Sequence, residues 1–136
     1  MTTEREKMTA GEPYNQFDPE LINRRVYMRQ QLEEINHITD NDNRNNRFKS
    51  LLADVGDDFF VESSFKFDYG FNIHIGNHFY GNYDMTFLDT CPITIGEHCY
   101  FGPTSAFIRQ FTHWIPYSET RMLNWVRQSL LAIMLG

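Results

Sequence analysis

An apolar residue followed by glycine recurs in the middle of the chain at a spacing that few folds accept. The pairs are Tyr69-Gly70, Ile75-Gly76, Ile95-Gly96 and Phe101-Gly102. The first two pairs lie six residues apart, and so do the last two. Between the two sets, Ile75 lies twenty residues before Ile95, which is three periods of six with two residues inserted. A period of six fits neither an amphipathic helix nor an alternating strand. It is typical of a parallel β-helix built from hexapeptides, each one short strand and a turn. A β-meander with scattered glycines is the alternative.

In such a coil the apolar residue points inward, glycine lets the backbone bend, and polar residues such as Asn77 and Glu97 face outward. His74 and His78 then occupy outward or turn positions, as surface or interface residues. We expect no metal site there, because a spacing of four places two histidines on one face only in a helix.

Size, charge and cysteine content narrow the class of protein. The 136 residues suffice for one domain, alone or with a small appendage. A net charge of -6 without a Lys/Arg stripe argues against a nucleic-acid surface. Residues 1–8 are charged and no apolar span is long enough for a bilayer, so we expect a soluble cytoplasmic protein without a membrane partner. Cys91 and Cys99 are expected to be packed thiols, with a disulfide as the open alternative.

Helical patterns precede the repeats. Residues 3–10 predict a short helix, and Asp18-Pro19 starts a second one, with Asp at the N-cap and Pro at the first position. Four apolar residues recur on one face of that helix, at steps of seven, four and three. They are Leu21, Met28, Leu32 and Ile35. The Asn- and Asp-rich residues 37–46 indicate a loop, and residues 47–55 a further short helix closed by Gly56. Strand composition begins at Phe59.

The residues of the repeats are more specific than their spacing. The stretch from Phe67 to Tyr83 reads FDYGFNIHIGNHFYGNY, and it is followed by FLD at 87–89, PITIG at 92–96 and FGP at 101–103. Together they closely resemble the maltose and galactoside O-acetyltransferases. The segment EREKMTAGEPY at 4–14, with the helix after Asp18, is similar to the N-terminal segment of that family. The resemblance covers residues 1 to about 107.

The resemblance implies a mainly β fold, a left-handed parallel β-helix preceded by an α-helical segment. It also implies a homotrimer that transfers acetyl from acetyl-CoA to a sugar hydroxyl, with the acceptor between neighbouring subunits. By position, Asp68, Asn82 and Asp89 match family residues that line the acceptor pocket. The last match is uncertain by one residue, so Thr90 is a candidate together with Asp89. Asn and Asp suit sugar hydroxyls as hydrogen-bond partners. They also serve solenoid turns, which is the alternative role.

The reaction needs a general base, for which a histidine titrating near neutral pH is suited. The family keeps this histidine nine residues after the proline of its FGP-like motif, within a T-x-x-H-P string. Here the ninth residue after Pro103 is Thr112. His113 comes one place after the family position and is followed by Trp114 where the family has proline. It is the candidate catalytic residue, although its position departs from the family pattern.

The family pattern stops after Phe107. The codons of residues 108–119 can be read in a shifted frame, in which each new codon starts at the third base of the preceding codon. One amino-acid sequence that codon degeneracy then permits is YTPIHPLDPVQR. The same operation on residues 123–136 permits ELGTAITIGDNAW. Both strings resemble what the family has there, so we infer that one base is missing near codon 107. The lost histidine then spans the codons of residues 111 and 112. A genuine divergent helix at residues 125–135 is the alternative.

The expected division is therefore a helical segment at 1–57, the first coils at 58–107 and an out-of-frame tail at 108–136. The first function hypothesis is an acetyl-CoA-dependent sugar O-acetyltransferase, an enzyme by family whose present chain is a truncated inactive fragment. The second is a non-catalytic sugar-binding or oligomerisation module. A third is a fragment that poisons trimers of an intact relative. The residues that bind acetyl-CoA stay unknown, because the expected region is missing.

Overall fold

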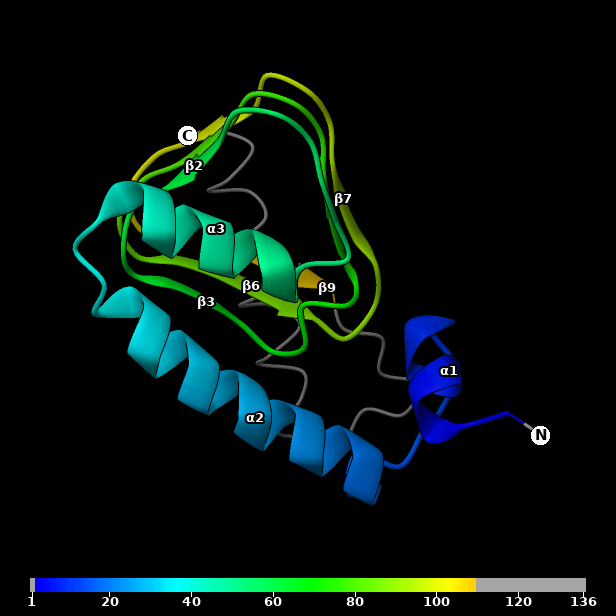
Figure 1. The fold of residues 1–136 in the computed structure, drawn as a ribbon. Coiled ribbons are helices and arrows are strands. Elements are labelled where there is room, and N and C mark those ends of the chain that lie inside the picture. Colours follow the sequence, from blue (N-terminus) through cyan, green and yellow to red (C-terminus); the bar gives the residue numbers. More distant parts are fainter. Residues whose placement is uncertain (1, 110–136) are drawn as a thin grey trace.

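A computed structural model describes residues 2–109, in which short helices precede a three-sided coil of strands (Figure 1). The helices are α1 (Glu4–Thr9), α2 (Pro19–Asn36) and α3 (Asn41–Leu51). The strands are β1 (Asp54–Val55), β2 (Phe59–Val61), β3 (Phe65–Phe67), β4 (Ile73–Ile75), β5 (Phe79–Gly81), β6 (Met85–Asp89), β7 (Ile93–Ile95), β8 (Tyr100–Phe101) and β9 (Ala106–Arg109).

The strands form three parallel sheets, one on each side of the coil. Their orders are β1-β4-β7, β2-β5-β8 and β3-β6-β9. Each strand pairs with the strand one coil later: Ile73 faces Ile93, and Phe59 faces Phe79, an offset of twenty residues. The predicted coil of hexapeptides is confirmed, including the twenty-residue step. The meander is excluded, because every strand pair between residues 54 and 109 is parallel.

The core of the coil is filled by alternate side chains of the strands, as in β3, where Phe65 and Phe67 are buried and Lys66 between them is exposed. Aromatic rings stack from coil to coil, as Phe59 does on Phe79 at 5.7 Å, and Phe65 meets Phe87 edge-on at 5.3 Å between centroids. Such ring pairs contribute beyond the apolar area that they bury. Phe48 of α3 continues the column at 5.2 Å from Phe65, so helix and coil share one core.

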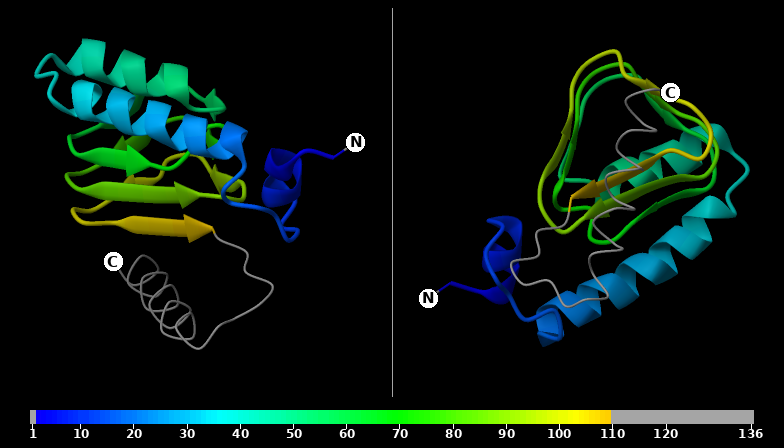
Figure 2. Two further views of the ribbon diagram at one scale, coloured as in Figure 1. Left: turned by 90° about the horizontal axis from the view of Figure 1, so that it is seen from below. Right: turned by 180° about the vertical axis from the view of Figure 1, so that it is seen from behind.

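The two longer helices cover the first coil, as the side view in Figure 2 shows. The predicted start of α2 is confirmed, because Asp18 accepts a hydrogen bond from the N–H of Glu20 and Pro19 is the first helical residue. The predicted apolar face is confirmed too, since all four of its residues are buried. They are Leu21, Met28, Leu32 and Ile35. Thr3 caps α1 through a capping box with Glu6.

Two local predictions are wrong. The predicted loop at 37–46 is mostly helix, because Asp40 caps α3 and accepts from the N–H of Asn43 at 2.8 Å. The predicted helix at 47–55 ends at Leu51, and Asp54–Val55 form strand β1, paired with β4. The Asp40 cap and the long-range bonds of Arg44 and Asn45 to the backbone of Val61 explain the first difference, since they outweigh the weak helix propensity of asparagine.

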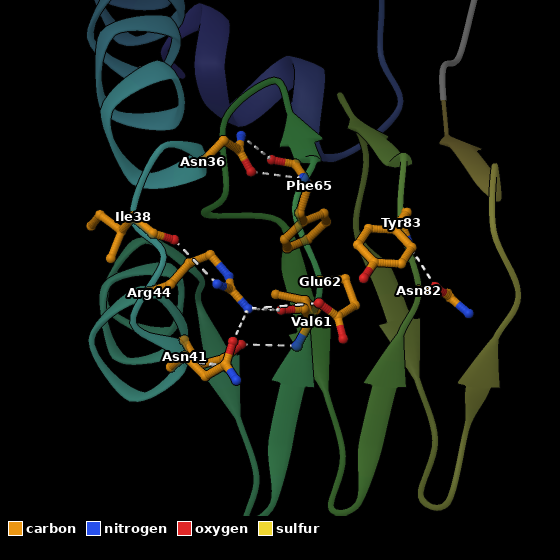
Figure 3. Close-up of polar contacts among 10 residues, drawn as sticks. Asn36, Ile38, Asn41, Arg44, Val61, Glu62, Phe65, Asn82 and Tyr83 are labelled. Atoms are coloured by element: carbon orange, nitrogen blue, oxygen red, sulfur yellow. Dashed lines mark hydrogen bonds and ion pairs between the residues drawn. The ribbon is translucent and has the colours of Figure 1, made fainter.

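The helices bind the exposed edge of the first coil through side-chain amides (Figure 3). Asn36 accepts from the N–H of Phe65 at 2.9 Å and donates to its carbonyl at 3.0 Å, as a neighbouring strand would. Asn45 of α3 accepts from the N–H of Val61 at 2.8 Å. The buried Arg44 donates to the Val61 carbonyl at 3.2 Å. These bonds satisfy backbone groups that a sheet edge otherwise leaves unpaired.

Cys91 and Cys99 are both free, as expected, with Cys91 buried and Cys99 packed against the core. Among residues 2–109, no helix has the length and apolar character needed to cross a bilayer.

Candidate functional site

A cleft of about 610 Å³ lies between α2 and the β3-β6-β9 sheet. Its walls combine apolar side chains with polar and charged ones. They are Arg25, Arg29, Leu32, Glu33, Asn36, His37, Ser64, Lys66, Phe67, Asp68, Thr86 and Leu88. A concave site of this size with a few convergent polar groups is the usual form of a small-molecule site.

Among the described residues, Asp68 is the one sequence-predicted site residue that lines this cleft. It follows strand β3 directly and is half-buried. Within residues 2–109, no side chain or backbone donor binds its carboxylate. Burial raises the pKa of Asp68, while the positive charges of Arg25 and Arg29 oppose that rise. Its carboxylate oxygens are therefore available to the hydroxyl groups of a ligand.

Asp89 has a different environment, because its side chain is completely buried. Oδ1 accepts from the backbone N–H of Tyr69 at 2.9 Å, and Oδ2 from that of Asn72 at 3.2 Å. Burial raises the pKa of Asp89 to about 7, against the lowering effect of these two hydrogen bonds. In this chain Asp89 joins one coil to the preceding one. Thr90 is also buried and donates from its hydroxyl to the Arg109 carbonyl.

Asn82 lies at another corner of the coil, after strand β5 (Figure 3). Its side-chain oxygen accepts from the N–H of Tyr83 at 2.8 Å, and its own N–H donates to the Phe101 carbonyl at 3.0 Å. Asn82 is not among the residues that line the cleft beside Asp68. One copy of the chain therefore does not bring these two predicted residues into one pocket.

The remaining candidates are the histidines. His113 lies outside the described residues. His78 lies at the surface, where it pairs with Asp58 at 2.8 Å and stacks on His98 at 4.6 Å between ring centroids. In the part of the chain that the structure describes, no group of three or more His, Cys, Asp or Glu side chains is arranged to hold a metal ion.

The basic residues of the cleft were not predicted as site residues. Arg25 and Arg29 are contributed by α2, four positions apart on one flank of its apolar face. The signal was the same helical period that identified the buried residues, because positions 25, 29 and 33 lie beside the buried Leu32. The sequence does not show that this flank of α2 lies over the β3-β6-β9 sheet.

Comparison with known proteins places these features in a family. The maltose acetyltransferase hexapeptide capping motif matches residues 7–56. The galactoside O-acetyltransferase of Escherichia coli is 32% identical over 100 residues, which are 72% of this chain and 49% of that protein. The chain spans about half the length of the curated relatives that it matches.

Solved structures agree with the sequence matches. The maltose O-acetyltransferase of Clostridium difficile superposes with a TM-score of 0.78 at 32% identity, covering 86% of this chain and 63% of that one. A hexapeptide-repeat acetyltransferase of Vibrio cholerae, solved with acetyl-CoA, gives a TM-score of 0.76 at 30% identity over 89% of this chain and 66% of that one. These matches confirm the predicted fold class, a left-handed parallel β-helix preceded by a helical segment.

Proposed function

We propose that this chain, which belongs to the hexapeptide-repeat family of maltose and galactoside O-acetyltransferases, carries the acceptor side of an acetyl-CoA-dependent sugar O-acetyltransferase. The observation that carries the proposal is the cleft between α2 and the β3-β6-β9 sheet, with the available carboxylate of Asp68 in its wall. The capping motif at 7–56 and the relatives named for maltose and galactoside support the same substrate class.

The acceptor pocket in this proposal lies between copies of the chain in a homotrimer. Asp68 follows β3 of the first coil and Asn82 follows β5 of the second, so they lie at different corners of the β-helix. In this proposal a second copy of the chain brings an Asn82 beside an Asp68. Asp68 accepts from the hydroxyl groups of the sugar, and the Asn82 amide both donates and accepts. Asp89 supports this wall indirectly, because it binds the backbone of Tyr69, the residue after Asp68. Thr90 binds the Arg109 carbonyl and likewise acts on the main chain.

In the transfer itself, the sugar oxygen attacks the thioester carbonyl of acetyl-CoA, the carbon–sulfur bond breaks, and coenzyme A leaves as the thiol. A base must take the hydroxyl proton as the bond forms. The family histidine has no counterpart at its expected position, and His113 is the one candidate. We therefore assign residues 1–57 to the helical cap, 58–107 to the first coils and 108–136 to an out-of-frame tail, and expect no turnover from this chain.

The test compares the purified chain with a version whose gene has one base inserted at codon 107. Release of coenzyme A thiol is followed with acetyl-CoA and either maltose or a galactoside. We expect no release from the present chain and release from the restored one. Turnover by the present chain that is abolished in His113→Ala would overturn the assignment of an inactive fragment.

A sugar-binding module is the second candidate, and the position of the cleft favours it. Among the described residues, those that line the cleft lie between positions 25 and 88, within the helical segment and the first coils. Calorimetry of the purified chain with maltose and with a galactoside tests this function. Saturable binding without thiol release supports the module, and the absence of both signals excludes it.

A further inference from the structure

A second cavity, of about 500 Å³, lies between α2, the N-terminal helix and the turn after β3. We call it the arginine cavity, and we call the cleft between α2 and the β3-β6-β9 sheet the acceptor cleft. The two share no lining residue in the part of the chain that the structure describes. Its walls are Arg5, Glu20, Leu21, Asn23, Arg24, Tyr27 and Phe71. Two guanidinium groups thus meet in one concave site, on a chain whose net charge is -6.

Both arginines are held in place by other parts of the fold. The Arg5 guanidinium lies over the Phe71 ring, 3.9 Å from its centroid. Arg24 lies 5.7 Å from the same centroid, and its Nε donates to the Tyr69 carbonyl at 3.1 Å. Tyr69 stacks on Phe71 at 5.1 Å, which fixes the ring itself. The two cations are therefore positioned before any ligand arrives, which reduces the entropy cost of binding.

The positive charge of the cavity is only partly neutralised. Glu20 lies 3.6 Å from Arg5, in a pair whose side chains are both about half exposed. Arg24 has no carboxylate partner among the described residues, and its two terminal nitrogens make no hydrogen bond there. Burial lowers the pKa of Arg24, and the nearby charge of Arg5 lowers it further. Both effects disfavour the charged form of Arg24, and the negative charge of a bound anion offsets them.

We propose that the arginine cavity binds a phosphate group, as carried by a small phosphate ester. A phosphate matches the site better than a carboxylate, because its oxygens and double negative charge suit two planar guanidinium forks. Asn23 and Tyr27 supply further polar groups in the wall, and the Phe71 ring supplies an apolar surface for the remainder of the ester. This site is independent of the sugar cleft and of acetyl transfer.

Consecutive residues of α2 serve the two cavities. Arg24 lines the arginine cavity, whereas Arg25 lines the acceptor cleft and donates to the Tyr69 hydroxyl at 2.7 Å. Successive helical residues point about 100° apart, so neighbouring arginines reach different sides of one helix. The two sites can therefore be altered separately.

The experiment titrates the purified full chain with inorganic phosphate at low ionic strength and follows binding by calorimetry. Glucose 6-phosphate is the second ligand, and glucose is its uncharged control. We expect saturable binding of both phosphates and none of glucose at this site. Equal affinities identify the phosphate group alone as the ligand, and tighter binding of the ester identifies a phosphorylated small molecule.

Arg5→Gln and Arg24→Gln each remove one guanidinium and should weaken phosphate binding by about tenfold or more, the loss expected for a charge-assisted pair. Arg47→Gln is the matched control, because Arg47 is an arginine of α3 that lines neither cavity. Arg5 is about half exposed, so its variant keeps the test valid if Arg24→Gln fails to fold. Absent binding, or binding that Arg5→Gln and Arg47→Gln weaken equally, overturns the proposal.

Discussion

The carboxylate of Asp89 binds the main chain of Tyr69 one coil earlier, with Oδ1 2.9 Å from the Tyr69 backbone nitrogen. Because burial raises the pKa of Asp89 to about 7, the folded chain binds a proton there more tightly than the unfolded chain does. Stability from this group is complete below the unfolded pKa of about 4 and is lost as the pH rises through about 7.

We therefore predict that the free energy of unfolding falls between about pH 4 and pH 7, by up to a few kcal/mol. Urea denaturation at several pH values measures it. In Asp89→Asn the pH dependence should flatten, although the variant loses one main-chain bond, because an amide presents one acceptor where the carboxylate presents two. A steep fall that persists in the variant would assign the effect to another group.

Asn36→Ala should destabilise the chain by about 2 kcal/mol, because it leaves both backbone groups of Phe65 without their side-chain partner. These bonds measure 2.9 and 3.0 Å and join the end of α2 to strand β3. Asn46→Ala is the control, since Asn46 is exposed on α3. Urea midpoints compare the two variants, and equal midpoints would show that Asn36 does not hold the helix to the coil.

Gly70→Ala should cost about 2 kcal/mol or more. Gly70 has a φ of 81°, a left-handed conformation, and a Cβ built there would lie 2.3 Å from the Leu51 carbonyl oxygen. Gly96→Ala is the matched control, because a Cβ at Gly96 meets nothing within 4 Å. Thermal unfolding should show a clear loss only for the first variant. A similar loss in both would mean that neither the φ value nor the carbonyl contact decides the cost.

Asp68→Ala should weaken maltose binding by about tenfold, the loss of hydrogen bonds between sugar hydroxyls and a charged group. Calorimetry measures the affinity. Asp57→Ala is the control, since Asp57 is an exposed aspartate at a corner of the coil and does not line the cleft. If both variants bind like the original chain, Asp68 is not an acceptor residue.

The repeats made much of the fold predictable. Ile75-Gly76 and Ile95-Gly96 set both the coil and its twenty-residue step, because an apolar residue must return to the core once per turn. The same step taken backward from Ile75-Gly76 reaches Val55-Gly56, the end of strand β1. That signal is present in the sequence, although the apolar pattern of residues 47–55 predicts a helix closed by the same glycine.

The roles of polar residues were less predictable, because one residue type serves several purposes. Asn45 reads as a loop residue by propensity, yet its side chain pairs with the edge of β2 and stabilises a helix. Asp68 and Asp89 are chemically alike, and only their burial separates a carboxylate open to a cleft from one bound to the main chain. The burial and the hydrogen-bond partners of these side chains depend on distant segments of the chain, so they cannot be predicted from the local sequence.

The twenty-residue pairing of the strands constrains how this chain tolerates change in length. An insertion of one complete coil adds a layer to the stack and leaves the strand pairing within the other coils unchanged. A single residue lost within a turn moves the side chains that follow it from the interior to the outer wall, because neighbours along a strand point to opposite sides. We therefore expect relatives of this chain to differ in height by complete turns, and their shorter insertions to gather at the corners.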